Sequence, residues 1–318
     1  MVKKQQRSKA KLIVLAVIVI VLALLPVVIH NDFYLQFLIT TAITAISVVG
    51  FDLTAGNMGY TSFGHSAFMG MGAYSMAILS KKVGLNFWVS LVLAIIISAL
   101  VAYLLAIPSF RLSGLYFSIG TMAFCQIFYL AVYNWQSLTG GTFGIAGVKS
   151  PFTSMTAKYY FVYIIFALVV YLMWRLIRSP IGSALTAIKE NEPLSESLGI
   201  ATVRMKRFTF MITGAVAGLA GALSSGMMGF ANPASYTMNT TLEYLVMSVV
   251  GGSGSLVGPI GAAFVLKIFS QVTSKLQELR MAIYGLLLLI VILFVPGGVY
   301  GSIKRAFANR KKAGKKEG

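Results

Sequence analysis

The chain has 318 residues, of which 58% are hydrophobic and 11% are charged, with a formal net charge of +18. A soluble domain usually carries about 25% charged residues, so this composition excludes an ordinary soluble domain and indicates a membrane protein with several spans. The cations lie in the tails and between apolar runs, which is typical of membrane orientation and lipid contact and not of nucleic-acid binding. One cysteine and two histidines exclude an internal disulfide and a Cys/His metal set.

The first predicted element is an uncleaved membrane span. The basic tail Met1–Lys11 precedes the apolar run Leu12–Ile29, which is long and has no cleavage site after it. A helix needs about 20 residues to cross the hydrocarbon core. The further predicted spans are, in chain order, Tyr34–Thr54, Ser66–Ser80, Phe87–Ile107, Leu115–Tyr133, Tyr159–Ile177, Phe208–Met228 and Met281–Val295.

Two apolar pieces near the C-terminus are too short to cross alone. Leu242–Val250 and Pro259–Ser270 flank Gly251–Ser255, a run that breaks helices. We predict a broken or re-entrant hairpin here. The predicted fold is therefore an all-α polytopic membrane protein with about eight full spans plus this hairpin, in eight to ten crossings.

The distribution of Lys and Arg predicts the orientation. With the N-terminus in the cytoplasm, 19 of the 26 cations fall on the cytoplasmic side, and both termini lie there. This predicts one membrane domain, residues 12–303, between a basic tail, 1–11, and a disordered basic tail, 304–318. Its cytoplasmic loop, 178–207, carries three of the eight acidic residues, Glu190, Glu192 and Glu196. Such a polar loop is a place to meet a cytoplasmic partner.

The segment Ala55–Phe68 joins two spans but is rich in glycine and hydroxyl groups and has no Lys or Arg. Irregular backbone at membrane depth survives only inside protein or beside a wet cavity. Gly59, Ser62, Gly64 and His65 are therefore candidates for a substrate path. Close helix packing through small residues explains the same composition, and both interpretations stay open.

A second glycine-rich break has a similar pattern. Gly252, Ser253, Gly254 and Ser255 interrupt the C-terminal apolar pieces, and the spacing Gly-x-x-Ser matches that of the first break. Interrupted segments in two halves of a transporter point to an internal repeat with a site at its interface. We therefore add these four residues to the candidate substrate path.

The remaining polar and small residues have simpler explanations. Asp52 and Glu243 are the acids nearest the membrane interior, and either couples an ion or is a hydrogen-bonded carboxylate near a helix end. Gly214, Gly218 and Gly221 predict close helix packing. The phosphate-binding loop Gly-x-x-x-x-Gly-Lys-[Ser/Thr] is absent, and no catalytic residue set or metal ligand set is visible.

Three segments together resemble the permease subunits of high-affinity branched-chain amino acid ABC transporters, the LivM/LivH family. They are Gly59–Leu79, Arg178–Ile200 and Val249–Ala263 with the closing Gly285–Gly301. Their order and the long cytoplasmic loop look more like the LivM member than the LivH member. The likeness covers most of the chain.

The resemblance implies a coupling element in the cytoplasmic loop. Lys189, Glu190, Glu192 and Gly199 fall where the family docks a short helix and a second turn into an ATPase subunit. Ser183–Lys189 reads as an amphipathic helix, while Pro193 fits a first helical turn and Gly199 a helix stop. Pro-Leu-Ser stands where the family has small alanines.

The resemblance also implies partners and a location. We expect an importer in the cytoplasmic membrane of a prokaryote, with a second LivH-like permease, two cytoplasmic ATP-binding subunits and an extracytoplasmic amino-acid-binding protein. The chain itself would bind no cofactor and be no enzyme, because ATP is used by the partner subunits. The same architecture carries urea, short amides or other amino acids. An ion-coupled secondary transporter using Asp52 or Glu243 is the alternative from another class.

Overall fold

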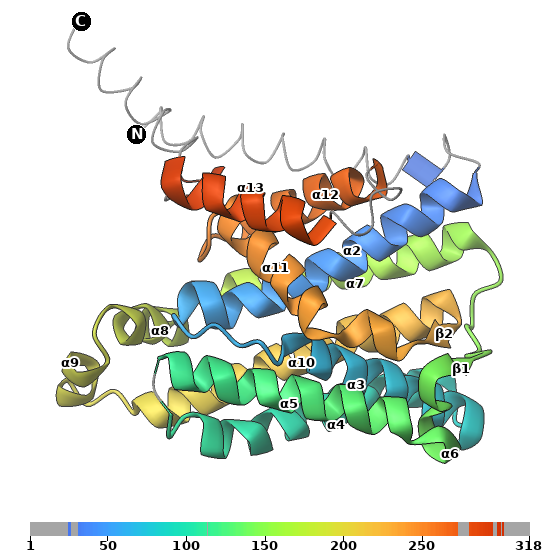
Figure 1. The fold of residues 1–318 in the computed structure, drawn as a ribbon, viewed down its shortest axis with the longest axis horizontal. Coiled ribbons are helices and arrows are strands. Elements are labelled where there is room, and N and C mark those ends of the chain that lie inside the picture. Colours follow the sequence, from blue (N-terminus) through green and yellow to red (C-terminus); the bar gives the residue numbers. More distant parts are fainter. Residues whose placement is uncertain are drawn as a thin grey trace, which may run out of the picture.

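The computed structural model describes residues 25–26, 31–112, 114–272, 280–294, 298–299 and 301. The basic tails, 1–11 and 304–318, lie outside the described residues, as does the predicted first span Leu12–Ile29 apart from residues 25 and 26. The described part is almost entirely helical (Figure 1).

Among the described residues, five helices are long and apolar enough to cross a bilayer. Four of them confirm a predicted span to within four residues at each end, and the fifth, Thr202–Met228, begins six residues before the predicted Phe208. Together they make the chain a multi-pass membrane protein. They are α2 (Asp32–Asp52, continued by the π-helical η1, Leu53–Asn57), α4 (Phe87–Ser109), α5 (Leu115–Asn134), α7 (Met155–Ile177) and α10 (Thr202–Met228).

Shorter helices occupy the other predicted apolar segments. The predicted span Ser66–Ser80 is α3 (His65–Ala77) with the π-helical η2 (Ile78–Lys82), and Met281–Val295 corresponds to α13 (Arg280–Phe294). The predicted hairpin forms α11 (Met238–Gly251) and α12 (Val257–Val272), which pack against each other. The helix α11 begins four residues before the predicted piece, because the polar residues Asn239, Thr240 and Thr241 continue the helix where the hydropathy pattern stops. The helix α12 extends two residues beyond its predicted piece at each end.

At the centre of the molecule α10 packs between α3 and α4, and glycines allow these helices to approach closely. A Cβ on Gly72 would lie 2.0 Å from the carbonyl oxygen of Gly218, and one on Gly221 would lie 1.8 Å from that of Met69. One on Gly214 would meet the Ala102 side chain at 2.2 Å. The predicted packing role of Gly214, Gly218 and Gly221 is therefore confirmed. It lets helix backbones touch, as helices in membranes often do.

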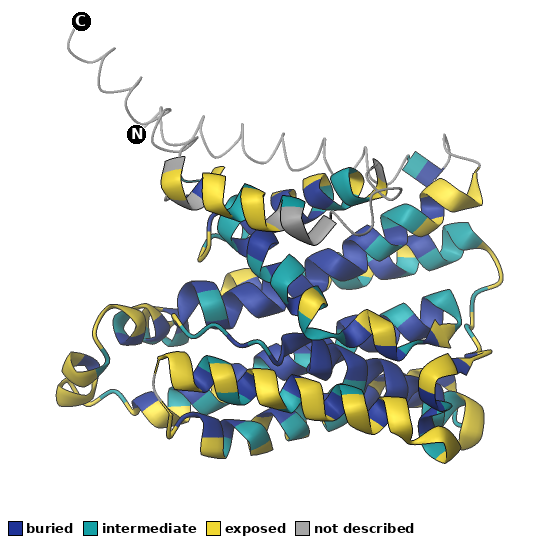
Figure 2. Cartoon of the chain, in the orientation of Figure 1, coloured by how far each residue is buried: buried dark blue, intermediate teal, exposed yellow. Residues whose placement is uncertain are grey.

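Burial separates the central helices from those that face outward (Figure 2). In α2, every residue from Thr41 to Asp52 is buried. In contrast, α4, α5 and α7 each expose a row of large apolar side chains, as helices in contact with lipid do. On α4 this row comprises Trp88, Val89, Val92, Ile96, Leu100, Tyr103 and Leu104.

The two ends of the bundle differ (Figure 1). One end carries α8 (Pro180–Glu190) and α9 (Glu192–Ser197). The other end carries α6 (Gln136–Thr139), η3 (Gly141–Phe143), η4 (Pro233–Tyr236) and the antiparallel pair of β1 (Ile145–Ala146) with β2 (Phe230–Ala231). Gly140, Gly144 and Gly147 all have positive φ, so turn chemistry accounts for this glycine-rich loop.

Candidate functional site

The loop 178–207, which the sequence predicts to be cytoplasmic, folds into two short helices that meet at Asn191. Pro180 begins α8 without losing a hydrogen bond, because the first helical amide has no partner within the helix. Leu185 and Ile188 are buried on its inner side. The Asn191 side chain accepts a hydrogen bond of 3.0 Å from the Leu194 amide and so caps α9. The predicted amphipathic helix at Ser183–Lys189 is confirmed within α8, and Pro193 lies in the first turn of α9.

Gly199 ends α9 with a left-handed backbone. Its φ is +83°, a region that favours glycine. The Gly199 amide donates to the Glu196 carbonyl at 2.9 Å, and the Ile200 amide donates to the Ser195 carbonyl at 3.0 Å. These two bonds are those of a Schellman motif. The predicted helix stop at Gly199 is therefore confirmed.

Lys189 connects α8 to the first glycine-rich break. Its Nζ donates a hydrogen bond of 2.6 Å to the Gly56 carbonyl oxygen at the end of η1. Gly59 lies against the stem of the same lysine, since a Cβ there would be 2.9 Å from Lys189 Cγ. The loop 178–207 and the first break are thus in direct contact.

Glu192 forms a second connection through a cluster with Tyr60 and Lys206. The Tyr60 hydroxyl donates to Glu192 Oε2 at 2.6 Å, and Lys206 makes an ion pair with Glu192 Oε1. Lys206 is 3% exposed and lies 5.4 Å from the Phe110 ring centroid. Lys206 is buried and Glu192 is half-buried, so loss of Glu192 would leave a buried charge without compensation. The cluster therefore ties α9, α10 and the first break together. Sequence reasoning identified Glu192 but missed Tyr60 and Lys206, which lie 132 and 14 positions away.

This cluster predicts a pH dependence. Partial burial raises the pKa of Glu192, but the hydrogen bonds from Lys206 and Tyr60 outweigh burial and hold it below its ordinary value of 4.5. The stabilisation is complete above that ordinary value and is lost as the pH falls through the lowered pKa. We expect the thermal unfolding midpoint of the purified protein to fall more steeply between pH 6 and pH 3 than that of Glu192→Gln. Glu190→Gln, which changes an exposed carboxylate of the same loop, is the matched control. Parallel curves for all three proteins would contradict this role.

Asp52 links the two glycine-rich breaks. Its Oδ1 accepts hydrogen bonds from Ser248 Oγ at 2.5 Å and from the Gly254 amide at 3.1 Å, and Oδ2 accepts from the same amide at 3.1 Å. Gly56 leaves no room for a side chain here, because a Cβ would lie 2.3 Å from the Gly254 nitrogen. The geometry agrees with the structural interpretation of Asp52, a hydrogen-bonded carboxylate near a helix end. Glu243 is half-buried on α11.

The other candidate path residues of the first break pack into the protein. His65 is fully buried, with Nε2 3.1 Å from Ser47 Oγ, and its ring meets Phe51 and Tyr244 edge-on. Ser62 is buried and accepts a hydrogen bond of 3.3 Å from the Gly64 amide. In this conformation they do not line an open path, and their role in transport stays a prediction.

The second break forms a tight turn between α11 and α12. Ser255 Oγ donates to the Gly252 carbonyl at 2.6 Å, and Gly252 has a φ of +110°. Ser253 Oγ lies 3.5 Å from that of Ser248. Gly254 contacts Gly56 of the first break and Asp52, which ends α2 just before that break. The two breaks therefore meet one turn before the Gly59–His65 segment that the sequence pattern selected.

Most of the chain is similar in sequence to known proteins. The family described as branched-chain amino acid transport system / permease component matches residues 33–293. The high-affinity branched-chain amino acid transport system permease protein LivM of Salmonella typhimurium is 31% identical, over 92% of this chain and 75% of its own length.

Two more distant relatives are also named as permease proteins. The LivH permease protein of the Salmonella typhimurium branched-chain system is 28% identical over 81% of this chain and 91% of its own length. The autoinducer 2 import system permease protein LsrC of Yersinia pestis is 28% identical over 55% of this chain and 53% of its own length. No solved structure matches the chain significantly. The chain therefore belongs to the family of branched-chain amino acid transport system permease components, and its resemblance within that family is to LivM-type members.

Proposed function

We propose that this chain is a permease subunit of an ATP-driven importer of branched-chain amino acids in the cytoplasmic membrane of a prokaryote. The LivM relative supports this cargo over that of LsrC, because its match spans 92% of the chain against 55%. The partners are a second, LivH-like permease, two cytoplasmic ATP-binding subunits and an extracytoplasmic amino-acid-binding protein. The chain itself binds no cofactor. Residues 12–303 form one membrane domain with both termini in the cytoplasm.

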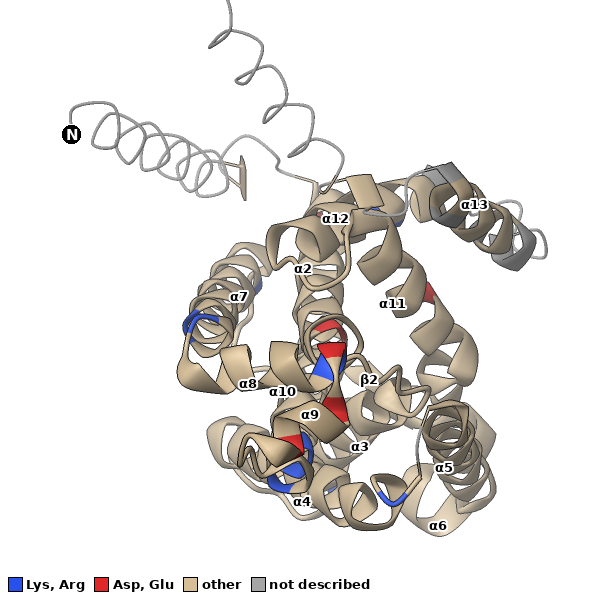
Figure 3. Ribbon diagram, turned by 90° about the vertical axis from the view of Figure 1, so that its left-hand side faces the viewer, with Lys and Arg blue, Asp and Glu red and all other residues tan. Residues whose placement is uncertain are grey.

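The observation that carries the proposal is the surface of α9. Leu194 of α9 is 56% exposed, and Leu198, which caps the C-terminal end of α9, is 74% exposed. Both lie at the bundle end where Lys, Arg, Asp and Glu gather around α8, α9 and α10 (Figure 3). In water, an apolar pair on a helix that is otherwise polar marks a site for a protein partner. An ATP-binding subunit is the partner that the family membership supports.

The contacts of the loop supply a way to transmit movement. Lys189 holds the end of η1, and Glu192 holds Tyr60 and Lys206, so displacement of α8 and α9 pulls on the first break. Asp52 then connects that break to the second break through Gly254. We propose that ATP binding moves the loop and that this chain of contacts changes access to a path along Gly59, Ser62, Gly64, His65 and Gly252–Ser255.

Purification of the tagged chain from its native membrane tests this proposal. We expect mass spectrometry to identify a second permease and ATPases that contain Gly-x-x-x-x-Gly-Lys-[Ser/Thr]. Leu198→Asp is expected to lose most of the ATPase while keeping the second permease, because a charge then occupies the apolar contact. Val83→Asp changes a side chain that is 59% exposed outside the loop and is expected to keep both partners. A chain recovered alone that moves solute in vesicles without ATP would instead support an ion-coupled transporter.

A further inference from the structure

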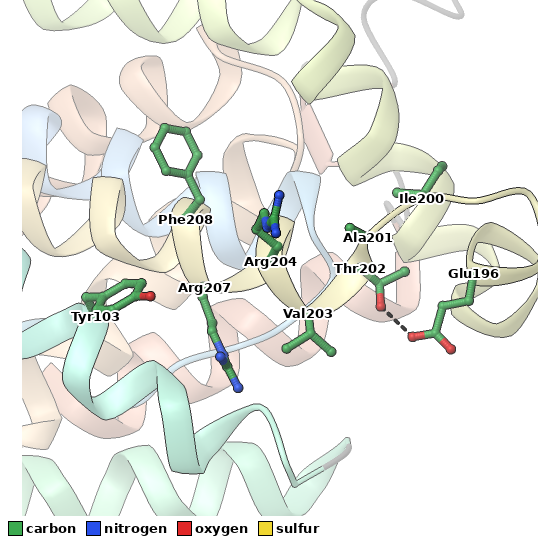
Figure 4. Close-up of a pocket in the computed structure, with 9 residues that line it drawn as sticks. All are labelled: Tyr103, Glu196, Ile200, Ala201, Thr202, Val203, Arg204, Arg207 and Phe208. Atoms are coloured by element: carbon green, nitrogen blue, oxygen red, sulfur yellow. Dashed lines mark hydrogen bonds between the residues drawn. The ribbon is translucent and has the colours of Figure 1, made fainter.

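A groove lies beside α9, where the start of α10 passes α4. Its volume is about 740 Å³, and its lining comes from the α9–α10 connection, the first two turns of α10 and Tyr103 of α4. Figure 4 shows its nine lining residues, with Arg204 and Arg207 extending from α10 in different directions. The groove is separate from the two glycine-rich breaks and from the exposed leucines of α9.

The groove contains cationic groups that the described residues leave without a hydrogen-bonding partner. Within the described residues, Arg204 and Arg207 form no ion pair, and Nε of Arg207 is buried with no acceptor. The one carboxylate in the lining, Glu196, accepts a hydrogen bond of 2.5 Å from Thr202 and keeps its negative charge, but the two arginines leave the lining with a net positive charge. A buried N–H of a guanidinium is costly to leave unpaired, so this groove favours an anionic ligand.

The N-terminus of α10 strengthens the preference of the groove for an anionic ligand. The groove covers the N-terminal turns of α10, which has 27 residues. The free amides and the dipole at the N-terminus of a long helix also favour negative charge. The two arginines and the helix N-terminus thus all favour a negatively charged ligand.

The side chains around the arginines are apolar, and this favours an anion that carries a hydrocarbon chain. Tyr103 is 40% exposed, Val203 40% and Phe208 39%. Tyr103 also continues the lipid-facing row of α4, following Ile96 and Leu100 at helical spacing. A ligand here can place its anion at Arg207 and its hydrocarbon along α4. A water-soluble anion or an acidic protein surface would leave that row uncovered.

We propose that this groove binds the phosphate headgroup of an anionic phospholipid from the cytoplasmic leaflet, with its acyl chains along α4. Arg207, whose buried Nε has no acceptor, holds the phosphate, Arg204 adds positive charge at the edge of the groove, and Tyr103 contacts the region where the headgroup joins the chains. Basic pockets between membrane helices on the cytoplasmic side are suited to such lipids. The site lies between α4, which packs on α10, and the ATPase-docking loop proposed above. Lipid bound there would brace the start of α10.

Native mass spectrometry of the delipidated, purified transporter in detergent tests the site, with phosphatidylglycerol and phosphatidylcholine as probes. We expect tight binding of phosphatidylglycerol only, and a loss of about thirtyfold in affinity when Arg204→Gln and Arg207→Gln are combined. Arg178→Gln is the matched control: it removes one cytoplasmic-end charge whose guanidinium already stacks 4.5 Å over Trp174, and it is expected to bind lipid as the wild type does. Elution profiles and unfolding midpoints equal to those of the wild type show that the variants are folded.

Three outcomes would overturn the proposal. The first is equal lipid binding by the double variant and the Arg178→Gln control. The second is displacement of the lipid by millimolar inorganic phosphate, which would identify a site for free anions. The third is loss of the ATP-binding subunits from the double variant with lipid binding unchanged, which would assign the groove to a protein contact. The lipid result does not depend on which solute the transporter carries.

Discussion

Gly221→Leu is expected to abolish accumulation of the folded protein in the membrane. A Cβ at this position would lie 1.8 Å from the Met69 carbonyl oxygen and 3.0 Å from the Ala73 nitrogen, both backbone atoms of α3. Backbone atoms cannot move aside as a flexible side chain can, so α3 and α10 would have to separate. Overpacking of a well-packed core costs about 1–3 kcal/mol and occasionally more. We expect a destabilisation at the upper end of this range or above it, because the Gly72–Gly218 contact on the same pair of helices would open as well.

The matched control is Gly261→Leu on α12. Gly261 is exposed, and a Cβ there would meet nothing within 4 Å. Replacing a helical glycine by a good helix former is expected to be neutral or to stabilise by up to about 1 kcal/mol. The measurement is the amount of monodisperse protein extracted in mild detergent, read by fluorescence-detected size-exclusion chromatography. Equal yields for the two variants would show that α3 and α10 do not touch at this glycine.

Gly199→Pro is expected to stop transport while leaving the membrane domain folded. Proline holds φ near −65°, whereas Gly199 has a φ of +83°, and proline also lacks the N–H that donates to the Glu196 carbonyl. A misplaced proline costs about 3 kcal/mol locally, or about a hundredfold in an equilibrium constant. The end of α9 would then open and displace Leu194 and Leu198, the proposed contacts of the ATP-binding subunit. Substrate uptake into ATP-loaded vesicles measures the effect.

Gly199→Asn separates the backbone requirement from the loss of glycine itself. Asparagine tolerates the left-handed conformation better than other residues with a side chain, and a Cβ here would meet nothing within 4 Å. We expect this variant to keep most of the uptake and its bound ATPase. Wild-type uptake by Gly199→Pro would refute the assignment of this loop to ATPase coupling. A Gly199→Pro protein that fails to reach the membrane would show that the loop is needed for folding.

The span helices and the two loop helices were predictable because their signals are local. Hydropathy summed over about 20 residues marks a helix that crosses a bilayer, and it identified α4, α5 and α7 to within a few residues. The Pro193 and Gly199 signals depend on the backbone of one or two residues, and both were correct. The same locality explains the error at the hairpin, where α11 begins at Met238 and not at Leu242 because its polar first turn carries no hydropathy signal.

The contacts that connect these elements could not be predicted from the sequence. Gly254 donates to Asp52 across 202 positions, and Lys189 donates to Gly56 across 133. No periodicity or composition encodes such pairs, since either glycine-rich break offers many free amides and carbonyls. The sequence by itself determined that this chain spans a membrane, that its helices pack through glycine and that the polar loop 178–207 contains short helices. Tertiary structure alone decided that Asp52 is a hydrogen-bonded link between the breaks and that Glu192 is held by Tyr60 and Lys206. Those partners are selected by how the helices pack in three dimensions, and the energy of each contact exists only after packing is complete.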